Sequence, residues 1–254
     1  MKKEKESGTP PEGFPMRLNK FVAYCGICSR RQAVEYIKDG QVRVNGQVVT
    51  EPGTLVAETD KVVYKDAEIK PEGKKVYILL NKPKNVITTL KDEKGRKTVM
   101  DLIKNRDNLR IFPVGRLDRA TTGLLVLTND GDLAKKLSHP SHKVKKIYEV
   151  GLDRNVDARD LVKIREGLKL EDGPAPVNWV EYIKDRPKSE VAIEIVIGRN
   201  RIVRRIFEHL GYQVKKLDRV YYGGLTKKDL PRGFSRNLSE KEILMLKHFT
   251  SSGK

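Results

Sequence analysis

The chain has 254 residues, of which 38% are hydrophobic and 34% charged, and 52 Lys and Arg against 34 Asp and Glu give a formal net charge of +18. This composition excludes disorder throughout and favours a polyanionic partner, with nucleic acid before a membrane, because phosphate contacts release counterions. No apolar run approaches the roughly 20 residues of a membrane-spanning helix, and residues 1–15 lack the apolar segment of a signal peptide. With only two cysteines, we expect a cytoplasmic protein without a disulfide framework.

The N-terminus begins with a charged, Pro- and Gly-rich stretch, residues 1–15, that predicts a disordered tail. The pattern then changes to helical spacing. Leu18, Phe21, Val22 and Cys25 recur on one face, which predicts a first helix that ends at Gly26.

A second helix follows at once. Ser29 is a favourable N-cap, Gln32 stands three residues on as in a capping box, and Gly40 marks the end of the helix. The next segment, "QVRVNGQVV", places two short β-patterned runs around Asn45-Gly46, which predicts a hairpin. Residues 16–64 therefore read as a small domain of two helices and a hairpin, and residues 65–75 have the composition of a linker.

The larger part of the chain, residues 76–248, mixes strands with short helices. "VYILLNK", "LLVLTND", "YEVGL" and "SEVAIEIVIG" have strand character, whereas helical patterns occur near 132–137, 157–166 and 201–210. Because strands and helices do not alternate regularly, we predict an α+β domain with a mixed, mainly antiparallel sheet and short flanking helices. Residues 249–254 are expected to form a tail.

Basic residues are spread over both helices and the hairpin of the small domain. A solvated charged surface is one interpretation of them. However, "MRLNKFVAYCGICSRRQAVEYIKDGQVRVNGQVV" resembles an S4 domain, a module that places two helices and a hairpin against structured RNA. By that resemblance, the expected phosphate contacts are Arg17, Lys20, Arg30, Arg31 and Arg43.

Two residue pairs consist of types that bind metal ions, but neither has the further ligands that a metal site needs. Cys25 and Cys28 form a lone C-x-x-C, but structural zinc takes four ligands and no second pair lies nearby in the small domain. Packing accounts better for Cys25, which continues the apolar stripe of the first helix. His139 and His142 likewise lack partner ligands in sequence and are interpreted as a loop feature, so we predict no metal site.

The segment "VGRLDRATTGLLVLTNDG" places Asp118 between Arg116 and Arg119, just before an apolar run. Such an acid commonly caps a turn or pairs with an arginine. Yet apolar strands flank the "GRLDRATTG" loop on both sides, and a loop held on rigid elements is a suitable platform for a site. A guanidinium beside the carboxylate would favour its charged form, which suits a nucleophile or base.

A second group of arginines lies in "GRNRIVRRIFEHLGY". Its apolar residues form one helical stripe and put Arg201, Arg204 and Arg205 on the opposite face, where solvation or RNA contact is expected. Arg204 is nearest the edge of the stripe and is best able to reach inward.

These motifs together resemble the RsuA/RluB family of ribosomal RNA pseudouridine synthases, in which an S4 domain precedes the catalytic domain. "GRLDRATTGLLVLTNDGDLAKKLSHPSHKVKKIYEV" resembles the catalytic motif, "LLNKPKNVITT" the first strand motif and "GRNRIVRRIFEHLG" the arginine helix. The resemblance runs from about residue 16 to residues 230–233. One departure is Ile202, where the family often has glutamine.

The resemblance implies isomerisation of uridine to pseudouridine. Asp118 is then the catalytic aspartate, as nucleophile or base, Tyr148 the tyrosine that stacks on a flipped base, and Arg204 the arginine that pairs with Asp118. Arg116, Arg201 and Arg205 are further expected RNA contacts. The reaction requires no cofactor, in agreement with the lack of a phosphate-binding or dinucleotide motif.

The target RNA and the alternatives follow from the same motifs. "TTGLLVLTNDGDLAKKLSHP" resembles the branch that modifies 23S ribosomal RNA of the large subunit more than the branch that acts on 16S RNA. The remaining alternatives are a synthase for 16S RNA and a non-catalytic S4-type RNA-binding or ribosome-assembly factor in which Asp118 is structural. A monomer is the default expectation.

Overall fold

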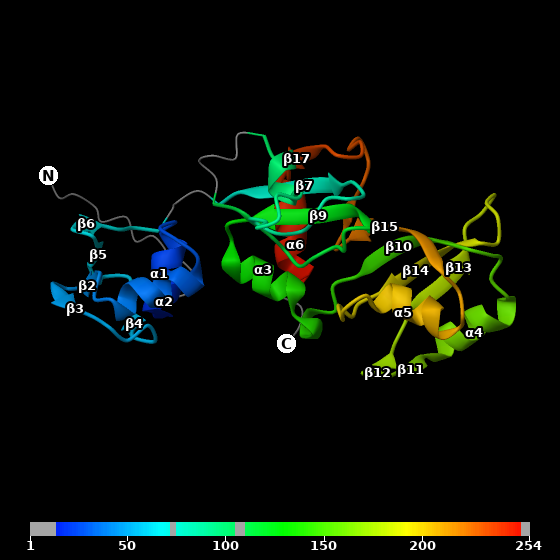
Figure 1. The fold of residues 1–254 in the computed structure, drawn as a ribbon, viewed down its shortest axis with the longest axis horizontal. Helices are drawn as coiled ribbons and strands as arrows, with labels where there is room; N and C mark the ends of the chain where they lie inside the picture. Colours follow the sequence, from blue (N-terminus) through cyan, green and yellow to red (C-terminus); the bar gives the residue numbers. More distant parts are fainter. Residues whose placement is uncertain (1–13, 72–74, 105–109, 250–254) are drawn as a thin grey trace, which may run out of the picture. The chain divides into compact units, whose positions relative to one another are not determined.

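The computed structural model describes residues 14–71, 75–104 and 110–249 and divides the chain into two compact units, Met1–Lys75 and Val76–Lys254 (Figure 1). The predicted tails, residues 1–15 and 249–254, lie almost wholly outside the described residues. No helix in the described ranges is long and apolar enough to cross a membrane.

The small unit contains the two predicted helices, α1 (Leu18–Tyr24) and α2 (Arg30–Lys38). α1 ends at Cys25, and Gly26 follows with a φ of +75°. The capping box of α2 is formed, because Ser29 Oγ accepts from the Gln32 N–H and Gln32 Oε1 accepts from the Ser29 N–H. Cys25 is buried in the core of this unit, which confirms its interpretation as a packing residue.

The strands of the small unit include the predicted hairpin, with Asn45 and Gly46 at positive φ between its two strands. Residues 65–69, predicted as linker, instead extend the sheet: β6 (Ala67–Glu68) pairs with β5 (Val62–Tyr64), and Ile69 is buried. The linker prediction was wrong here because polar composition hid a tight turn at Lys65 and Asp66, both at positive φ. The strands are β1 (Met16–Arg17), β2 (Val42–Val44), β3 (Gln47–Val48), β4 (Leu55–Val56), β5 (Val62–Tyr64) and β6 (Ala67–Glu68).

The large unit is built on one nine-stranded sheet in the order β13-β14-β10-β15-β9-β7-β17, with β16 beside β15 and β8 beside β9. Every pairing in it is antiparallel except β9 with β15, which confirms the predicted mainly antiparallel α+β fold. The strands of the path are β7 (Tyr77–Lys82), β9 (Thr122–Thr128), β10 (Lys146–Leu152), β13 (Trp179–Tyr182), β14 (Glu190–Ile195), β15 (Val214–Tyr222) and β17 (Ser235–Asn237). The shorter strands are β8 (Phe112–Pro113), β11 (Leu168–Leu170), β12 (Gly173–Ala175) and β16 (Leu225–Thr226).

β7 and β9 are buried on both faces, which explains why their sequences are continuous apolar runs rather than alternating ones. One face packs on α3 (Gly131–Ser138) and on α6 (Glu240–Phe249), as Figure 1 shows. The other face packs on side chains from residues 86–103, which include the short helix η1 (Val99–Leu102), and on Ile111 and Leu117.

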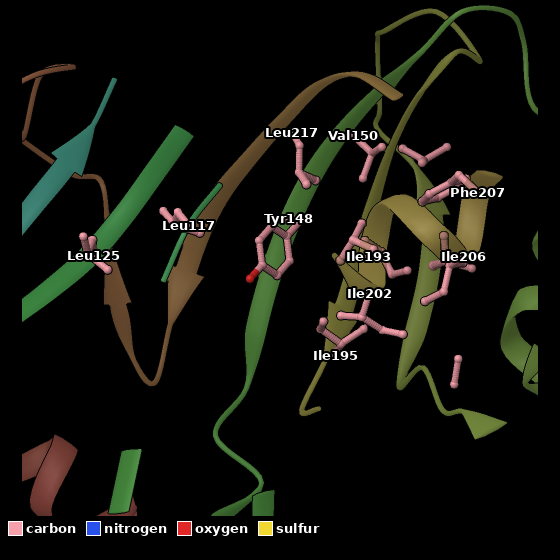
Figure 2. Packing of buried hydrophobic residues seen from close by; sticks show 14 of the residues in the cluster. Leu117, Leu125, Tyr148, Val150, Ile193, Ile195, Ile202, Ile206, Phe207 and Leu217 are labelled. Atoms are coloured by element: carbon pink, nitrogen blue, oxygen red, sulfur yellow. The ribbon is translucent and has the colours of Figure 1, made fainter. Parts of the chain in front are cut away.

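The other half of the sheet, β10 with β13 and β14, is covered on one face by α4 (Ala158–Glu166) and α5 (Ile202–His209). α3, α4 and α5 confirm the three predicted helices. α6 was not predicted, and neither was the short helix η3 (Pro140–His142), which contains His142. The main hydrophobic core runs across the sheet from Leu125 to Phe207 (Figure 2). The loop that carries Asp118 joins this sheet at the start of β9, near the centre, and is therefore held by packing on both sides.

Candidate active site

A cavity of about 340 Å³ lies where the loop that carries Asp118 meets β10, β15 and the segment before α5. Asp118, Arg116, Tyr148 and Arg201 line this cavity, so the fold brings four predicted residues from distant parts of the sequence together. Arg204 and Arg205 are not among its lining residues.

A second cavity, of about 390 Å³, is also charged, but each of its acidic side chains is paired with an arginine. Arg232 donates to both oxygens of Asp218, and Arg186 donates to Glu149. The Asp118 cavity differs, because two of its lining residues, Thr121 and Arg219, each have a buried polar atom (Oγ1 and Nη2) without a hydrogen-bond partner among the described residues. A buried polar group without a partner calls for an explanation, and beside a cavity a bound ligand can supply the partner. Because this cavity also contains Asp118 and Tyr148, we assign the candidate active site to it.

The Asp118 loop is held from beneath by Lys82, whose side chain is fully buried at the end of β7. Lys82 Nζ donates to the backbone carbonyls of Asp118 (3.1 Å), Thr121 (2.8 Å) and Pro83 (3.1 Å). An ammonium has three donors, and here three carbonyls use them. Burial lowers the pKa of Lys82 to about 8, and the nearby Asp118 charge opposes that shift.

The segment after β7 holds the loop from its other side. Thr88 Oγ1 donates to the carbonyl of Leu117 at 2.7 Å, and the Asn85 N–H donates to the carbonyl of Arg119 at 2.9 Å. The Thr121 N–H closes a turn onto the Asp118 carbonyl at 3.0 Å. The loop backbone is thus fixed independently of the Asp118 side chain, which is 39% exposed.

The ion pair on Asp118 is made by Arg201, with 3.8 Å between Nη1 and Oδ2. Arg201 is the N-cap of α5 rather than a residue of the helix face, and its φ of +48° lies in the left-handed region. This turn directs the chain back toward the cavity. The same guanidinium also contacts Glu208 at 3.2 Å.

Among the described residues Arg204 makes no ion pair with Asp118, so their predicted pairing stays a prediction. Arg204 is 6% exposed, and its Nη1 donates to the carbonyl of Val214 at 2.9 Å. Arg204 reaches inward as predicted, but the three arginines of α5 do not share one exposed face. Burial and the Arg201 charge lower the pKa of Arg204, whereas the Asp118 charge opposes this shift, so Arg204 lies within electrostatic reach of the carboxylate.

Arg205 and Arg116 have different surroundings. Arg205 pairs with Asp172 in the turn between β11 and β12, where Nη1 lies 2.9 Å from Oδ2. Arg116 is exposed at the cavity. Both remain predicted RNA contacts, but Arg205 is engaged by Asp172, whereas Arg116 is exposed at the cavity and is better placed for a phosphate near Asp118.

Tyr148 stands on the cavity side of β10, where buried and half-buried residues alternate. Its ring is 8% exposed and lies between Leu117 on one side and Ile195 and Ile202 on the other, with Leu217 above it (Figure 2). Apolar neighbours fix the ring, and the cavity exposes part of it. A fixed aromatic ring near a carboxylate provides a surface on which a flipped base can stack.

Three residues of this site were not predicted: Lys82, Lys146 and Arg219. Lys146 is half-buried at the cavity, and its Nζ donates to the carbonyls of Val144 and Val196, both at 2.9 Å. Burial, followed by the Arg219 charge, lowers the pKa of Lys146 to about 8. A signal existed for Lys146, which stands two residues before Tyr148 and hence on the same face of the strand.

The predicted RNA contacts of the small unit lie on its surface or half-buried. Arg17, Arg30, Arg31 and Arg43 are exposed, and Lys20 is half-buried. Arg43 already pairs with Asp66 at 3.2 Å, with both side chains more than half exposed. Such an exposed ion pair contributes little to stability, so Arg43 can exchange Asp66 for a phosphate at little cost.

Comparison with known proteins identifies the family of the chain. The family model for RNA pseudouridylate synthase matches residues 76–209, and the S4 domain model matches residues 16–62. Ribosomal large subunit pseudouridine synthase B of Bacillus subtilis is 42% identical over 94% of this chain and 98% of its own length. An RNA pseudouridine synthase of Mycobacterium tuberculosis is 40% identical, with 96% of both chains covered.

A solved structure gives the same result. A crystal structure of a pseudouridylate synthase matches with a TM-score of 0.66 and 30% identity, and covers 91% of this chain and 99% of its own. The fold and cavity therefore belong to an RNA-modifying enzyme with an S4 domain. More specifically, the chain is a member of the RNA pseudouridine synthase family.

Replacing Lys82 with Met should destabilise the large unit and loosen the Asp118 loop, because three backbone carbonyls lose their shared donor. We expect the free energy of unfolding to fall by about 1–3 kcal/mol, measured by urea denaturation, and activity to fall with it. The control is Lys84→Met, two residues on and exposed, with an expected change within about 0.5 kcal/mol. Equal effects of the two substitutions would contradict the tethering role.

Lys82 and Lys146 should titrate near pH 8. Each amine is then charged below that pH and neutral above it, whereas an unfolded lysine keeps its proton to about pH 10.4. These two groups therefore make the folded state relatively more stable as pH rises from about 8. NMR of lysines labelled at Cε should show two resonances with low midpoints, assigned by Lys82→Met and Lys146→Met. Midpoints above 10 for every lysine would refute this prediction.

Proposed function

We propose that this enzyme converts uridine to pseudouridine in 23S ribosomal RNA of the large subunit, with Asp118 as the catalytic carboxylate. The observation that carries the proposal is one cavity that contains Asp118, the ring of Tyr148 and several cationic side chains. The name of the Bacillus subtilis relative, which has 98% of its length covered, supports the choice of the large subunit.

The reaction breaks the bond from ribose C1′ to uracil N1, rotates the base and forms a bond from C1′ to C5. C5 loses its hydrogen, and N1 gains one, so atoms balance without water or a redox partner. For this reason we propose that the enzyme uses no cofactor. Asp118 is accessible enough to add to the sugar or to remove a proton from it, and its fixed backbone holds the carboxylate in place.

The base must leave its stack before the carboxylate can reach it, which costs a few kcal/mol. Tyr148 offers a stacking surface that offsets this cost. Arg116, Arg201, Arg204 and Arg205 are proposed to hold the backbone around the target or to stabilise charge near Asp118. In the S4 domain Arg17, Lys20, Arg30, Arg31 and Arg43 are proposed to bind phosphates of the folded RNA.

The cellular setting follows from the substrate. We propose that the enzyme acts in the cytoplasm as a monomer on ribosomal RNA or on an assembly intermediate, without a membrane partner. Its net charge of +18 suits such a polyanion.

Asp118→Asn should abolish isomerisation while folding and RNA affinity stay nearly unchanged, because the side chain is half-exposed and its loop is held by the backbone. We expect a loss on the order of 10³-fold or more, measured as tritium release from a 23S transcript labelled at uridine C5. The matched control is Asp185→Asn at an exposed turn, which should release tritium at the wild-type rate. A folded Asp118→Asn protein that keeps its activity would overturn the assignment and favour a structural role for Asp118.

Replacing Arg30 and Arg31 together with Gln should weaken RNA binding about uniformly across sequences and reduce the slope of log K against log salt by about 2, because each arginine is expected to neutralise one phosphate. At saturating RNA the turnover rate should be unchanged. Filter binding at several salt concentrations measures the slope. Lys70→Gln, an exposed lysine of the same unit that pairs with Glu68, serves as the control. If the double variant keeps the wild-type slope of log K against log salt, these two arginines do not contact the RNA.

The choice of target RNA is tested in cells. Pseudouridine mapping in strains with and without the gene should show one site or a small group of sites lost from 23S RNA. Loss of a 16S site instead would show that the target is the RNA of the small subunit.

A further inference from the structure

The floor of the Asp118 cavity is formed by two neighbouring strands. On β10 and β15, Tyr148 stands directly opposite Arg219, and Lys146 stands opposite Tyr222. All four residues line the cavity. Arg219 and Tyr222 are three positions apart and would point to opposite faces of a regular strand. A register shift between these two pairs adds one residue to β15 and brings both side chains to the same face.

Arg219 is unusually buried for an arginine. It is 4% exposed, its Nε donates to the carbonyl of Leu124 at 2.7 Å, and its guanidinium lies 4.6 Å from the centre of the Tyr222 ring. Its Nη2 is buried and has no hydrogen-bond partner among the described residues. Native proteins rarely leave a buried charged donor without an acceptor. The position beside Tyr148 suggests that the substrate supplies the acceptor.

Two neighbouring groups complement Arg219. Lys146 Nζ donates to two carbonyls, which leaves one of the three hydrogens of an ammonium unused by these bonds. Thr121 Oγ1 is buried at the same cavity and, within the described ranges, has no partner. A hydroxyl both donates and accepts, whereas the two cations only donate. The cavity therefore offers donors on two side chains and an acceptor on a third.

Uracil has a matching edge. Its imide group presents a carbonyl, an N–H and a second carbonyl in a row. When the base rotates from an N1 link to a C5 link, the two carbonyls exchange places and the N–H stays between them. Donors that face this edge are satisfied both before and after the rotation. Cytosine has an amino group in place of one carbonyl and would set a donor against a donor.

We infer that Arg219 binds the C4 carbonyl oxygen on the imide edge of the uracil that stacks on Tyr148, and that it thereby selects uridine over cytidine. Lys146 and Thr121 complete the recognition of the same edge. This inference rests on the proposed function, and it assigns Arg219 to substrate recognition rather than to the making or breaking of the glycosidic bond.

The test replaces one oxygen of the target base. Stem-loop RNAs that contain the mapped target site carry either uridine or 4-thiouridine at that position, and the full-length protein converts each under single-turnover conditions. Nuclease digestion and chromatography resolve the products. Because sulfur is a weak acceptor, the wild-type enzyme should convert the 4-thiouridine RNA more slowly, by about tenfold or more.

Arg219→Gln should convert uridine more slowly and should lose most of this discrimination, so that the rate ratio of the two RNAs approaches one. A purely structural role would lower both rates and leave the ratio at its wild-type value. Arg199→Gln is the matched control, because Arg199 lines the same cavity but its guanidinium is used by Asp172 and by the carbonyl of Gly173. Its ratio should equal that of the wild type.

Two results would overturn the inference. One is a wild-type enzyme that converts both RNAs equally well, which needs no variant and so does not depend on whether Arg219→Gln folds. The other is a folded Arg219→Gln protein that keeps the full wild-type ratio. Both differ from failure of the proposed function, in which the wild-type protein forms no pseudouridine in any ribosomal RNA.

Discussion

The candidate active site depends on one buried charge. The ammonium of Lys82 is removed from water at the end of β7, and its three hydrogen bonds go to backbone carbonyls, two of which belong to the Asp118 loop. Burial of an unpaired charge is costly unless its hydrogen bonds are complete. A movement of the loop that breaks these bonds would leave Lys82 unsatisfied, so the cost of burying its charge favours the observed conformation of the loop.

A second constraint acts where the two halves of the sheet meet. β9 and β15 form the one parallel pairing of this sheet, and Gly123 lies against Arg219 so closely that a Cβ would overlap the Arg219 backbone. The loop that begins at Gly115 thus ends at a residue that no other side chain can replace without displacing β15. Lys82 holds the backbone of Asp118, and Gly123 allows the close approach of β9 to the Arg219 backbone. The carboxylate and the recognition residues are consequently held on one rigid frame.

Local signals made much of this fold predictable from the sequence. The capping box at Ser29 located α2, and the Asp118 loop was evident because apolar strands flank it. α6 was missed although Ser239 and Glu242 form a similar box, because residues 243–246 are a continuous apolar run without helical spacing. Arg219 was not predictable for a related reason: the register shift in β15 breaks the alternation from which facing is inferred. A lysine such as Lys82 gives no sequence signal that distinguishes a buried ammonium from an exposed one.

The roles of the arginines near Asp118 differ according to the burial of each side chain, not according to their spacing in the sequence. Arg201 pairs with Asp118 at 3.8 Å, and both side chains are about two-fifths exposed, so this ion pair adds little to stability. Arg204 is buried, and its backbone contact at Val214 ties α5 to β15. The loop does not need the Asp118 carboxylate for its own conformation, since Lys82 and Thr88 hold it through the backbone. A carboxylate that the structure does not require in this way is available for chemistry, which distinguishes Asp118 from Asp172 and Asp218, each saturated by cations.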